Sequence, residues 1–212
     1  INPTHYETIK ERLKHEWGIH SMKVLIACEC SGRIRDAFRK KGHDAWSCDL
    51  KPDENDNSEY HIQDNVLKHL DEGWDMMIGH PVCTYICRNR SQLNKKQKVK
   101  IDTSLFMELL NANIDKICIE NPVPSLAAGL PKYTQIIQPY HYGHDHSKKT
   151  CLWLKNLPVL KPTKMTKLTY VTTDNGHRYT KGWYYTPRNS TDRSRTFKGI
   201  ARAMANQWGK LN

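Results

Sequence analysis

The chain has 212 residues, with 33 Lys+Arg against 22 Asp+Glu and a formal net charge of +11. This length is enough for one domain with a buried core, and no apolar run approaches the roughly 20 residues that a membrane span needs. No signal-peptide pattern opens the chain, and the seven cysteines are odd in number and irregular in spacing. The sequence argues against a membrane protein and against a disulfide-rich secreted protein, so we expect a cytoplasmic location.

The charge is unevenly distributed along the chain. Residues 44–75 hold ten acidic residues and two lysines, whereas residues 76–212 hold 22 Lys+Arg and seven acidic residues, a local net charge of +15. A basic surface of this kind favours a polyanion such as nucleic acid, because phosphate contacts release bound counterions. The alternative is an ordinary solvated basic face.

Predicted strands and helices alternate along most of the chain. Short apolar runs predict strands at 23–28, 44–49, 75–79, 116–120 and 151–154. Apolar residues at helical spacing predict helices at 4–17, 31–41, 63–70, 99–111 and about 200–208. Strands joined through helices form crossover connections, so the predicted fold class is α/β, a mostly parallel sheet with helices on both faces.

Residues 161–190 interrupt this alternation. The segments 168–173 and 177–185 flank Asp174-Asn175-Gly176, which is typical of a type I′ turn between two strands. We therefore expect a small β-hairpin outside the main sheet. The predicted organisation is a helical extension (1–21), a core (22–160), a hairpin segment (161–193) and a C-terminal helix that completes the core (194–212).

Polar residues follow the first two predicted strands, at the edge where parallel sheets bind ligands. The turn 28–32 lacks the full Gly-x-Gly-x-x-Gly of a dinucleotide site, so phosphate binding is not indicated, although a tight turn into a helix can approach an adenosyl group. Asp49 ends the second strand, and a carboxylate there can accept hydrogen bonds from ribose hydroxyls. A solvated loop residue is the alternative.

The next two strand ends carry a thiol and a carboxylate. Cys83 follows the strand at 75–79 and is a candidate nucleophile, with a half-buried structural cysteine as the alternative. His80, Cys83 and Cys87 have the spacing of a partial metal site, but no fourth ligand is evident, and no metal is predicted. Glu120 follows an apolar run, and we expect desolvation to raise its pKa so that it can donate a proton near neutral pH.

The order of these motifs resembles the cytosine-C5 DNA methyltransferases, most closely the small phage-type members. The matching segments are MKVLIACECSG (22–32), HPVCTY (80–85), ENP (120–122), SKKTCLWL (147–154) and SRTFKGIARAMANQWG (194–209). Each motif is short, but the ordered set covers nearly the whole chain and is specific. The resemblance implies a Rossmann-like fold that uses S-adenosylmethionine.

The resemblance also implies a reaction. Such enzymes flip the target cytosine out of the DNA helix, because C5 and C6 are unreachable in the stack. Cys83 would add to C6, Glu120 would protonate or hydrogen-bond N3, and the methyl group would be transferred to C5. Lys148 and Thr150 occupy places where larger relatives carry two arginines that help to hold the base and the catalytic loop. We expect double-stranded DNA as the partner, a monomer without metal, and the bacterial host cytoplasm if a phage encodes the chain.

Ligand-binding residues follow from the same comparison. The turn around the methionine part of the cofactor would comprise Cys28, Glu29, Cys30, Ser31 and Gly32. Asp49 would contact the ribose, Asp64 or Asn65 the adenine, and Pro81 would also line the cofactor site. The basic loop 88–100 would close over DNA phosphates, and the hairpin would be a reduced recognition element that reads roughly two to four base pairs. The DNA-contacting residues would be Arg88, Arg90, Lys95, Lys96, Arg178 and Lys181. The alternatives are a solvated basic face for the loop and a cover for the sheet edge for the hairpin.

Two departures from the family pattern leave other functions open. Val82 precedes Cys83, where the family almost always has a proline that stiffens the loop. Related chains also often read Gly-Asp where this one reads Asp64-Asn65. The alternatives are a DNA-binding homologue with impaired catalysis, or a methyltransferase that acts on cytosine in nucleotides or RNA.

Overall fold

The computed structural model describes residues 21–55 and 59–210, apart from the side chains of Arg90 and Ser190. The helix expected at 4–17 lies outside these residues. Within them, seven strands form one sheet in the order β3-β2-β1-β4-β5-β7-β6. These strands are β1 (Lys23–Ala27), β2 (Asp44–Asp49), β3 (His61–Gln63), β4 (Met76–Gly79), β5 (Lys116–Pro122), β6 (Gln135–Ile137) and β7 (Thr150–Lys155).

The sheet is mostly parallel. β1 pairs in parallel with β2 and β4, β2 with β3, and β4 with β5, whereas β7 is antiparallel to both β5 and β6. The chain runs outward from β1 to β3 and then continues on the other side through β4. The switch in strand order therefore falls between β1 and β4, where α/β sheets bind ligands at the carboxyl ends of their strands. The predicted fold class, a Rossmann-like α/β sheet, is confirmed.

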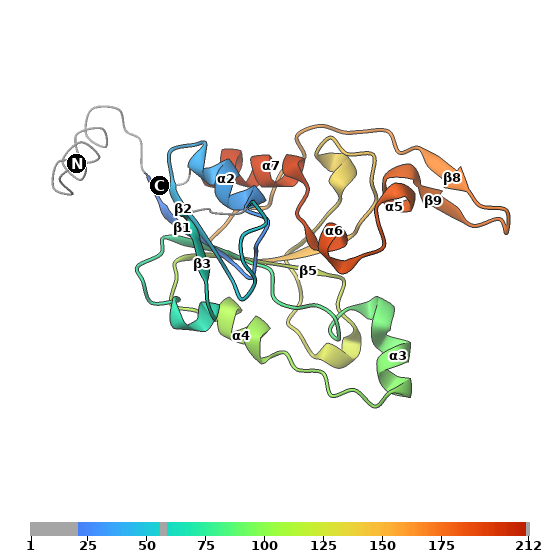
Figure 1. The fold of residues 1–212 in the computed structure, drawn as a ribbon, viewed down its shortest axis with the longest axis horizontal. Coiled ribbons are helices and arrows are strands. Elements are labelled where there is room, and N and C mark those ends of the chain that lie inside the picture. The colour runs from blue at the N-terminus through green and yellow to red at the C-terminus, as the bar shows by residue number, and fades with distance from the viewer. Residues whose placement is uncertain (1–20, 56–58, 211–212) are drawn as a thin grey trace.

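Helices cover both faces of the sheet (Figure 1). The helices α2 (Arg33–Arg39) and α7 (Lys198–Trp208) pack on one face, and α4 (Ser104–Leu110) packs on the other. Successive residues of β1 alternate between these two layers, because side chains along a strand point to opposite faces. Val24 and Ile26 join the cluster that contains Phe38 and Trp208, and Leu25 joins the opposite cluster.

Two predicted helices differ from those observed. The segment 63–70 holds the end of β3 and only a single 3-10 turn, η1 (Val66–Lys68), which begins where the Asn65 side chain accepts a hydrogen bond from Leu67 N. The helix predicted at 99–111 begins at Ser104, after Lys98 with a positive φ of 50°. The basic stretch before it contains η2 (Arg88–Arg90) and α3 (Ser91–Lys96). Among the described helices, none has the length and hydropathy of a membrane span.

The predicted hairpin is present but shorter than expected. It consists of β8 (Tyr170–Thr172) and β9 (Arg178–Thr180), and it projects from the sheet layer in Figure 1. Residues expected to extend the second strand form α5 (Lys181–Tyr185) instead, followed by α6 (Ser190–Ser194). The turn is not type I′, because Gly176 alone has a positive φ, and its N–H donates to Thr173 O at 2.8 Å. The role of this segment as a recognition domain stays a prediction.

Long-range contacts account for the change from strand to helix. Gly182 N donates to Asp145 O at 3.1 Å, and a Cβ at Gly182 would lie 2.1 Å from the same oxygen. Asp145 also accepts a hydrogen bond through its carboxylate, from Thr169 N at 2.8 Å. The base of the hairpin is thus fixed to the core at a point that only glycine can occupy.

Candidate active site

The carboxyl ends of β4 and β5 bring Cys83 and Glu120 into one site. Cys83 is half-buried in the loop after β4, and Glu120 lies in β5 with 16% of its side chain exposed. Burial raises the pKa of the Cys83 thiol, the nearby Cys87 and Glu120 raise it further, and Lys148 opposes them. The thiol, the carboxyl group and the lysine are therefore within electrostatic reach of one another. In the described part of the chain, no group of three or more His, Cys, Asp or Glu side chains is arranged to hold a metal ion.

The Glu120 carboxyl group has polar and charged partners that its neighbours in sequence do not indicate. His80 Nδ1 lies 2.9 Å from Glu120 Oε2, and Lys148 and the Thr150 hydroxyl also face the carboxyl group. Burial alone would raise the pKa of Glu120, but the hydrogen bond with His80 and the charges of His80 and Lys148 outweigh burial and lower it. The expectation of a raised pKa was wrong, because the partners lie just after β4 and at or just before the start of β7 rather than next to Glu120 in sequence.

Lys148 and Thr150 lie beside Glu120, and the role that the resemblance implies for them stays a prediction. Lys148 Nζ donates to Arg193 O at 2.8 Å, and Thr150 Oγ1 donates to Lys148 O at 3.3 Å. The two side chains line a small cavity together with Glu120 and Phe197. Lys148 therefore connects the carboxyl group to α6.

The turn after β1 is held by its own buried carboxylate. Glu29 accepts hydrogen bonds from the Ser31 hydroxyl and from Gly32 N, the latter at 3.1 Å. Gly32 has a φ of 67°, and a Cβ there would lie 2.3 Å from a guanidinium nitrogen of Arg35. A left-handed conformation and a close approach thus both require glycine at this position.

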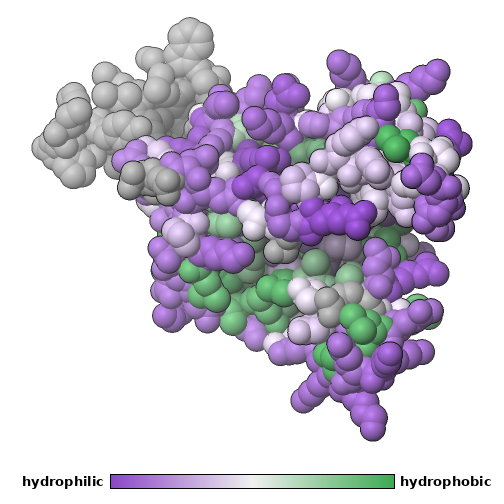
Figure 2. Space-filling view, turned by 45° about the vertical axis from the view of Figure 1, so that its right-hand side comes forward, coloured by the Kyte–Doolittle hydropathy of each residue, from purple (hydrophilic) through white to green (hydrophobic). Residues whose placement is uncertain are grey.

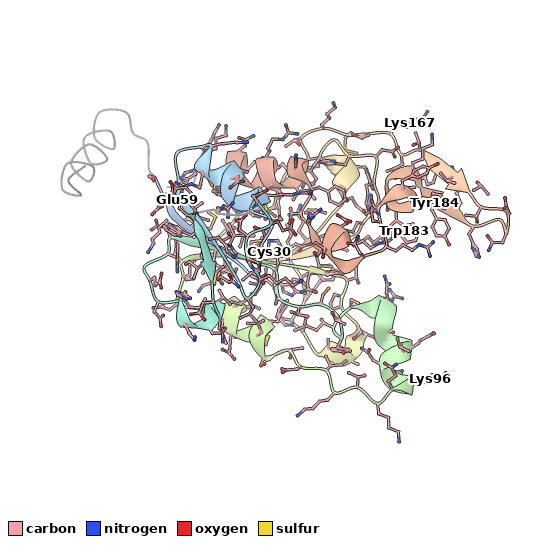
Figure 3. All side chains as sticks on the ribbon, in the orientation of Figure 1. Cys30, Glu59, Lys96, Lys167, Trp183 and Tyr184 are labelled. Carbon is pink, nitrogen blue, oxygen red and sulfur yellow. The ribbon has the colours of Figure 1, made fainter. Side chains whose placement is uncertain are left out.

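Three carboxylates surround this turn. Burial and, to a smaller extent, the negative charge of Asp49 raise the pKa of Cys28 to about 12. Burial, followed by Asp49, Glu54 and Glu29, raises the pKa of Cys30 to about 11. Cys30 is labelled in Figure 3. An environment this acidic suits a positively charged ligand and opposes a phosphate.

The other predicted cofactor residues differ in availability. Asp49 accepts from Lys51 N at 2.9 Å. Asp64 accepts hydrogen bonds from Lys68 and His69, and its pKa falls to about 2, chiefly because of the Lys68 hydrogen bond. Asn65 begins η1, so Asp64 and Asn65 are engaged within their own segment. Pro81 is buried, and its carbonyl accepts from Asn121 Nδ2 at 3.0 Å, which ties the loop of Cys83 to β5.

A buried ion pair supports the turn from below. Arg35 is 2% exposed and Asp53 is 7% exposed, and their side chains are hydrogen-bonded to each other. Arg35 also donates to Ser47 Oγ at 2.9 Å. The pair joins α2 to the loop after β2 directly beneath Gly32, so it fixes the shape of the candidate cofactor site.

Replacing Asp53 with asparagine is expected to lower the free energy of unfolding by about 3 kcal/mol, because the buried Arg35 charge would lose its buried counterion and keep only the exposed Asp36. Denaturant unfolding measures the effect. Asp36→Asn is the matched control, since Asp36 contacts the same guanidinium at 2.9 Å but is 47% exposed; we expect a loss below about 1 kcal/mol there. Equal losses in the two variants would contradict the role given to the buried pair.

A cleft of about 650 Å³ adjoins Glu120 through Lys148. The loop before α3 lines one side of the cleft, and α5 and α6 line the other. Its cationic residues are Arg88, Lys148, Lys149 and Arg193, and its aromatic residues include Tyr133 and Trp183. The Arg193 guanidinium lies 4.8 Å from the centre of the Trp183 ring. Asp192 also lines the cleft, but it is paired with Arg195 at 2.6 Å.

The remaining basic residues predicted to contact DNA lie on two projections beside the cleft, a hairpin projection (β8, β9, α5) and an α3 projection (η2, α3). Figure 3 shows Trp183 and Tyr184 on the first and Lys96 on the second, and Figure 2 shows hydrophilic residues at the ends of both. Lys95 and Lys96 are exposed on α3, and Lys181 is exposed at the start of α5. Arg178 lies over the Tyr170 ring at 3.9 Å, and the side chain of Arg90 is outside the described part. Among the predicted residues whose side chains the structure describes, Arg88 alone lines the cleft.

Sequence reasoning missed several residues of the site. His80 stood within a recognised motif, yet nothing in the sequence indicated its bond to Glu120. Lys149 was adjacent to a predicted residue, and the role of Arg193 depends on the packing of α6 against the cleft. A basic residue in a basic segment carries no signal that distinguishes a cleft position from a solvated one.

No protein-family model and no curated protein matches this sequence. Among solved structures, the chain is similar to the Entamoeba histolytica methyltransferase EhMeth, with 14% identity, a TM-score of 0.47, and coverage of 69% of this chain and 58% of that one. It is also similar to an rRNA methylase from Escherichia coli, with 14% identity, a TM-score of 0.35, and coverage of 70% of this chain and 62% of that one. A third similar structure is WbdD in complex with a kinase inhibitor, with 14% identity, a TM-score of 0.39, and coverage of 84% of this chain and 46% of that one. The match spans less than two thirds of each of these proteins, and every TM-score is below 0.5. The strand order and the geometry of the site carry the arguments that follow.

Proposed function

We propose that this protein transfers a methyl group from S-adenosylmethionine to C5 of cytosine in duplex DNA. The observation that carries the proposal is the meeting of Cys83 and Glu120 at the carboxyl ends of adjacent strands, with Lys148 facing both. Addition to C6 needs a thiolate, and activation of C5 needs a hydrogen-bond or proton donor at N3. One thiol and one carboxyl group at the same sheet edge supply this pair of functions.

The reaction begins with transfer of the Cys83 proton to water. Because burial raises the pKa of this thiol, most of it is protonated in the free protein, and the positive charge of Lys148 favours the thiolate. The thiolate forms a bond to C6 while Glu120 donates to N3, so that electron density moves to C5. After C5 has taken up the methyl group, its proton passes to water, the C5–H electron pair restores the C5–C6 double bond, and the bond between sulfur and C6 breaks so that the thiolate is regenerated.

The acidic turn after β1 fits the proposed cofactor. S-adenosylmethionine has a sulfonium and an ammonium group, and both suit the carboxylates of Glu29 and Asp49. Glu54, the third carboxylate near the turn, is paired with Arg195 at 2.7 Å. The turn 28–32 would hold the methionine part, and Asp49, at the end of β2, would accept from the ribose hydroxyls. When bound there, the cofactor supplies an electrophilic methyl group to the edge of the sheet that carries Cys83.

The basic cleft fits a nucleic-acid strand. A cytosine must leave the base stack before C6 is accessible, and the unpaired region then exposes phosphates and base faces. Arg88 and Lys149 can contact phosphates, and Trp183 offers a ring beside the Arg193 guanidinium. These features support DNA as the substrate.

Replacing Arg88 or Lys149 with alanine is expected to weaken DNA binding similarly for all sequences. Each variant should also reduce the slope of log K against log salt by about 1, because one phosphate contact releases about one counterion. Titration of labelled duplex DNA at several salt concentrations measures both quantities. Lys41→Ala, an exposed lysine just after α2 and outside the cleft, should leave the slope unchanged; the same slope in all three variants would remove the cleft from the DNA interface.

The decisive experiment for the proposed function is transfer of labelled methyl from S-adenosylmethionine to unmodified duplex DNA. Label on cytosine C5 is the expected result. Parallel reactions with RNA and with deoxycytidine nucleotides distinguish DNA from the other cytosine substrates. Preferential labelling of RNA or nucleotides would mean that DNA is not the substrate. No label on any of the three would contradict the proposed methyltransferase activity.

A second candidate is a DNA-binding protein that has lost catalysis. Val82 favours it, because this residue is 67% exposed in the loop of Cys83 and lacks the fixed φ of proline. A looser loop would hold the thiol less reproducibly against C6. Such a protein would bind duplex DNA with a steep salt dependence and transfer no label.

A further inference from the structure

His80 holds a position between the two strands on either side of β4. Its backbone N donates to Ala27 O of β1 at 2.9 Å, and its Nδ1 lies 2.9 Å from Glu120 Oε2 of β5. The His80 side chain is 11% exposed and the Glu120 side chain 16% exposed. The two groups are therefore held in contact by the sheet itself and are largely shielded from water.

The other ring nitrogen of His80 has a different environment. Nε2 is buried and has no hydrogen-bond partner among the described residues. Whether it carries a proton or not, Nε2 has no hydrogen-bond partner there. Burying this polar atom therefore lowers the stability of the fold, which an apolar residue at the same position would not do. A buried polar atom without a hydrogen-bond partner, at the edge of a sheet where ligands bind, is typical of a functional site. The contact that offsets this cost is the one between Nδ1 and Glu120.

The groups that face the pair favour an ionised carboxyl group in the free protein. Lys148 and the Thr150 hydroxyl approach Glu120 from the β7 side, and Cys83 approaches it from the loop after β4. Two further thiols that sense its charge, those of Cys118 and Cys151, are buried in β5 and β7. Since the pKa of Glu120 is lowered, the carboxyl group alone would be deprotonated at neutral pH and could not give a proton to N3. A second group must hold that proton.

We propose that His80 is the proton-holding partner of Glu120, so that the two side chains share one proton and deliver it to N3 of the cytosine ring. This inference rests on the proposed function. As the Cys83 sulfur bonds to C6, a proton moves from His80 Nδ1 to the Glu120 carboxylate and a carboxyl proton moves to N3, which leaves a neutral imidazole and an ionised carboxylate. When the bond between sulfur and C6 breaks, the proton returns from N3 by the same path.

His80→Asn tests the proposal against a purely positional role. The asparagine amide can donate to Glu120 in place of Nδ1–H, but it cannot take up and release a proton. We expect kcat for methyl transfer to fall about 10²-fold, which is typical of lost acid–base catalysis, with KM for DNA changed less than about twofold. The loss of kcat at high pH should also begin at a lower pH than in the wild type, because Glu120 would hold the proton alone. Wild-type kcat and pH profile in His80→Asn would overturn the proposal.

A spectroscopic measurement decides the proposal without any activity. In the protein labelled with 15N at its histidines, the Nδ1 and Nε2 signals of His80 are followed through a pH titration in the wild type and in Glu120→Gln. We expect the His80 transition to move to lower pH when the carboxylate is removed, and the same transition in both proteins would overturn the shared proton. If the wild type transferred no methyl group to any substrate, the proposed function would fail, while this titration would still show whether the pair holds one proton.

Discussion

Cys83→Ser is expected to reduce methyl transfer to duplex DNA by roughly 10⁴-fold or more, as is usual when a covalent nucleophile is removed. A serine hydroxyl is far less acidic than a thiol, and no general base is hydrogen-bonded to this position in the described structure. The half-buried site accepts the smaller oxygen with little change, so folding and cofactor affinity should be retained. Label transfer at saturating DNA measures the loss, and thermal unfolding verifies the fold.

Cys87→Ser is the control for this variant. Cys87 lies in the same loop, is also half-buried, and donates its backbone N–H to Cys83 O at 3.1 Å. Its removal takes away one influence that raises the pKa of Cys83, so activity should be retained. Undiminished transfer in Cys83→Ser, or equal losses in the two variants, would remove Cys83 from the mechanism.

The sequence was most informative where structure depends on local residues. The strands of 23–27 and 44–49 are short apolar or alternating runs, and each was predicted within one residue. Where long-range contacts decide, the prediction failed. Residues 181–185 have the aromatic composition of a strand, but the docking of Gly182 against Asp145 O turns them into a helix. The position of β7 between β5 and β6, and its reversed direction, also have no local signal.

The same distinction applies to the candidate site. The thiol and the carboxyl group were located from strand ends and motifs, because the carboxyl ends of parallel strands meet at one edge. Their protonation could not be derived in this way. His80 is 40 residues from Glu120 in sequence, and Lys148 reaches it from the segment just before β7, so the direction of the pKa shift depends on the sheet order. The cleft combines loops from several segments, and of the predicted DNA contacts with described side chains only Arg88 lines it.

Glu120→Gln is expected to reduce kcat for methyl transfer by about 10²- to 10⁴-fold, the range typical of a lost general acid. The glutamine amide occupies nearly the same volume and can still donate a hydrogen bond to N3, but it cannot transfer a proton there. Since both the substrate and the variant side chain stay in place, KM for DNA should change much less than kcat. Label transfer over a range of DNA concentrations separates the two constants.

The same variant has a second expected effect, on stability. The pKa of Glu120 is lowered in the folded state, so its ionisation stabilises the fold above the unfolded-state value of about 4.3, and that contribution is lost as the pH falls through the folded-state pKa. As the pH is lowered from neutral to below the pKa of a free glutamate, urea unfolding should therefore show that Glu120→Gln loses less stability than the wild type. Glu108→Gln, at an exposed position of α4, is the control and should follow the wild type in both assays. Reduced kcat with unchanged acid sensitivity would mean that Glu120 acts on N3 without the partners seen in the structure, whereas wild-type kcat would exclude it as the group at N3.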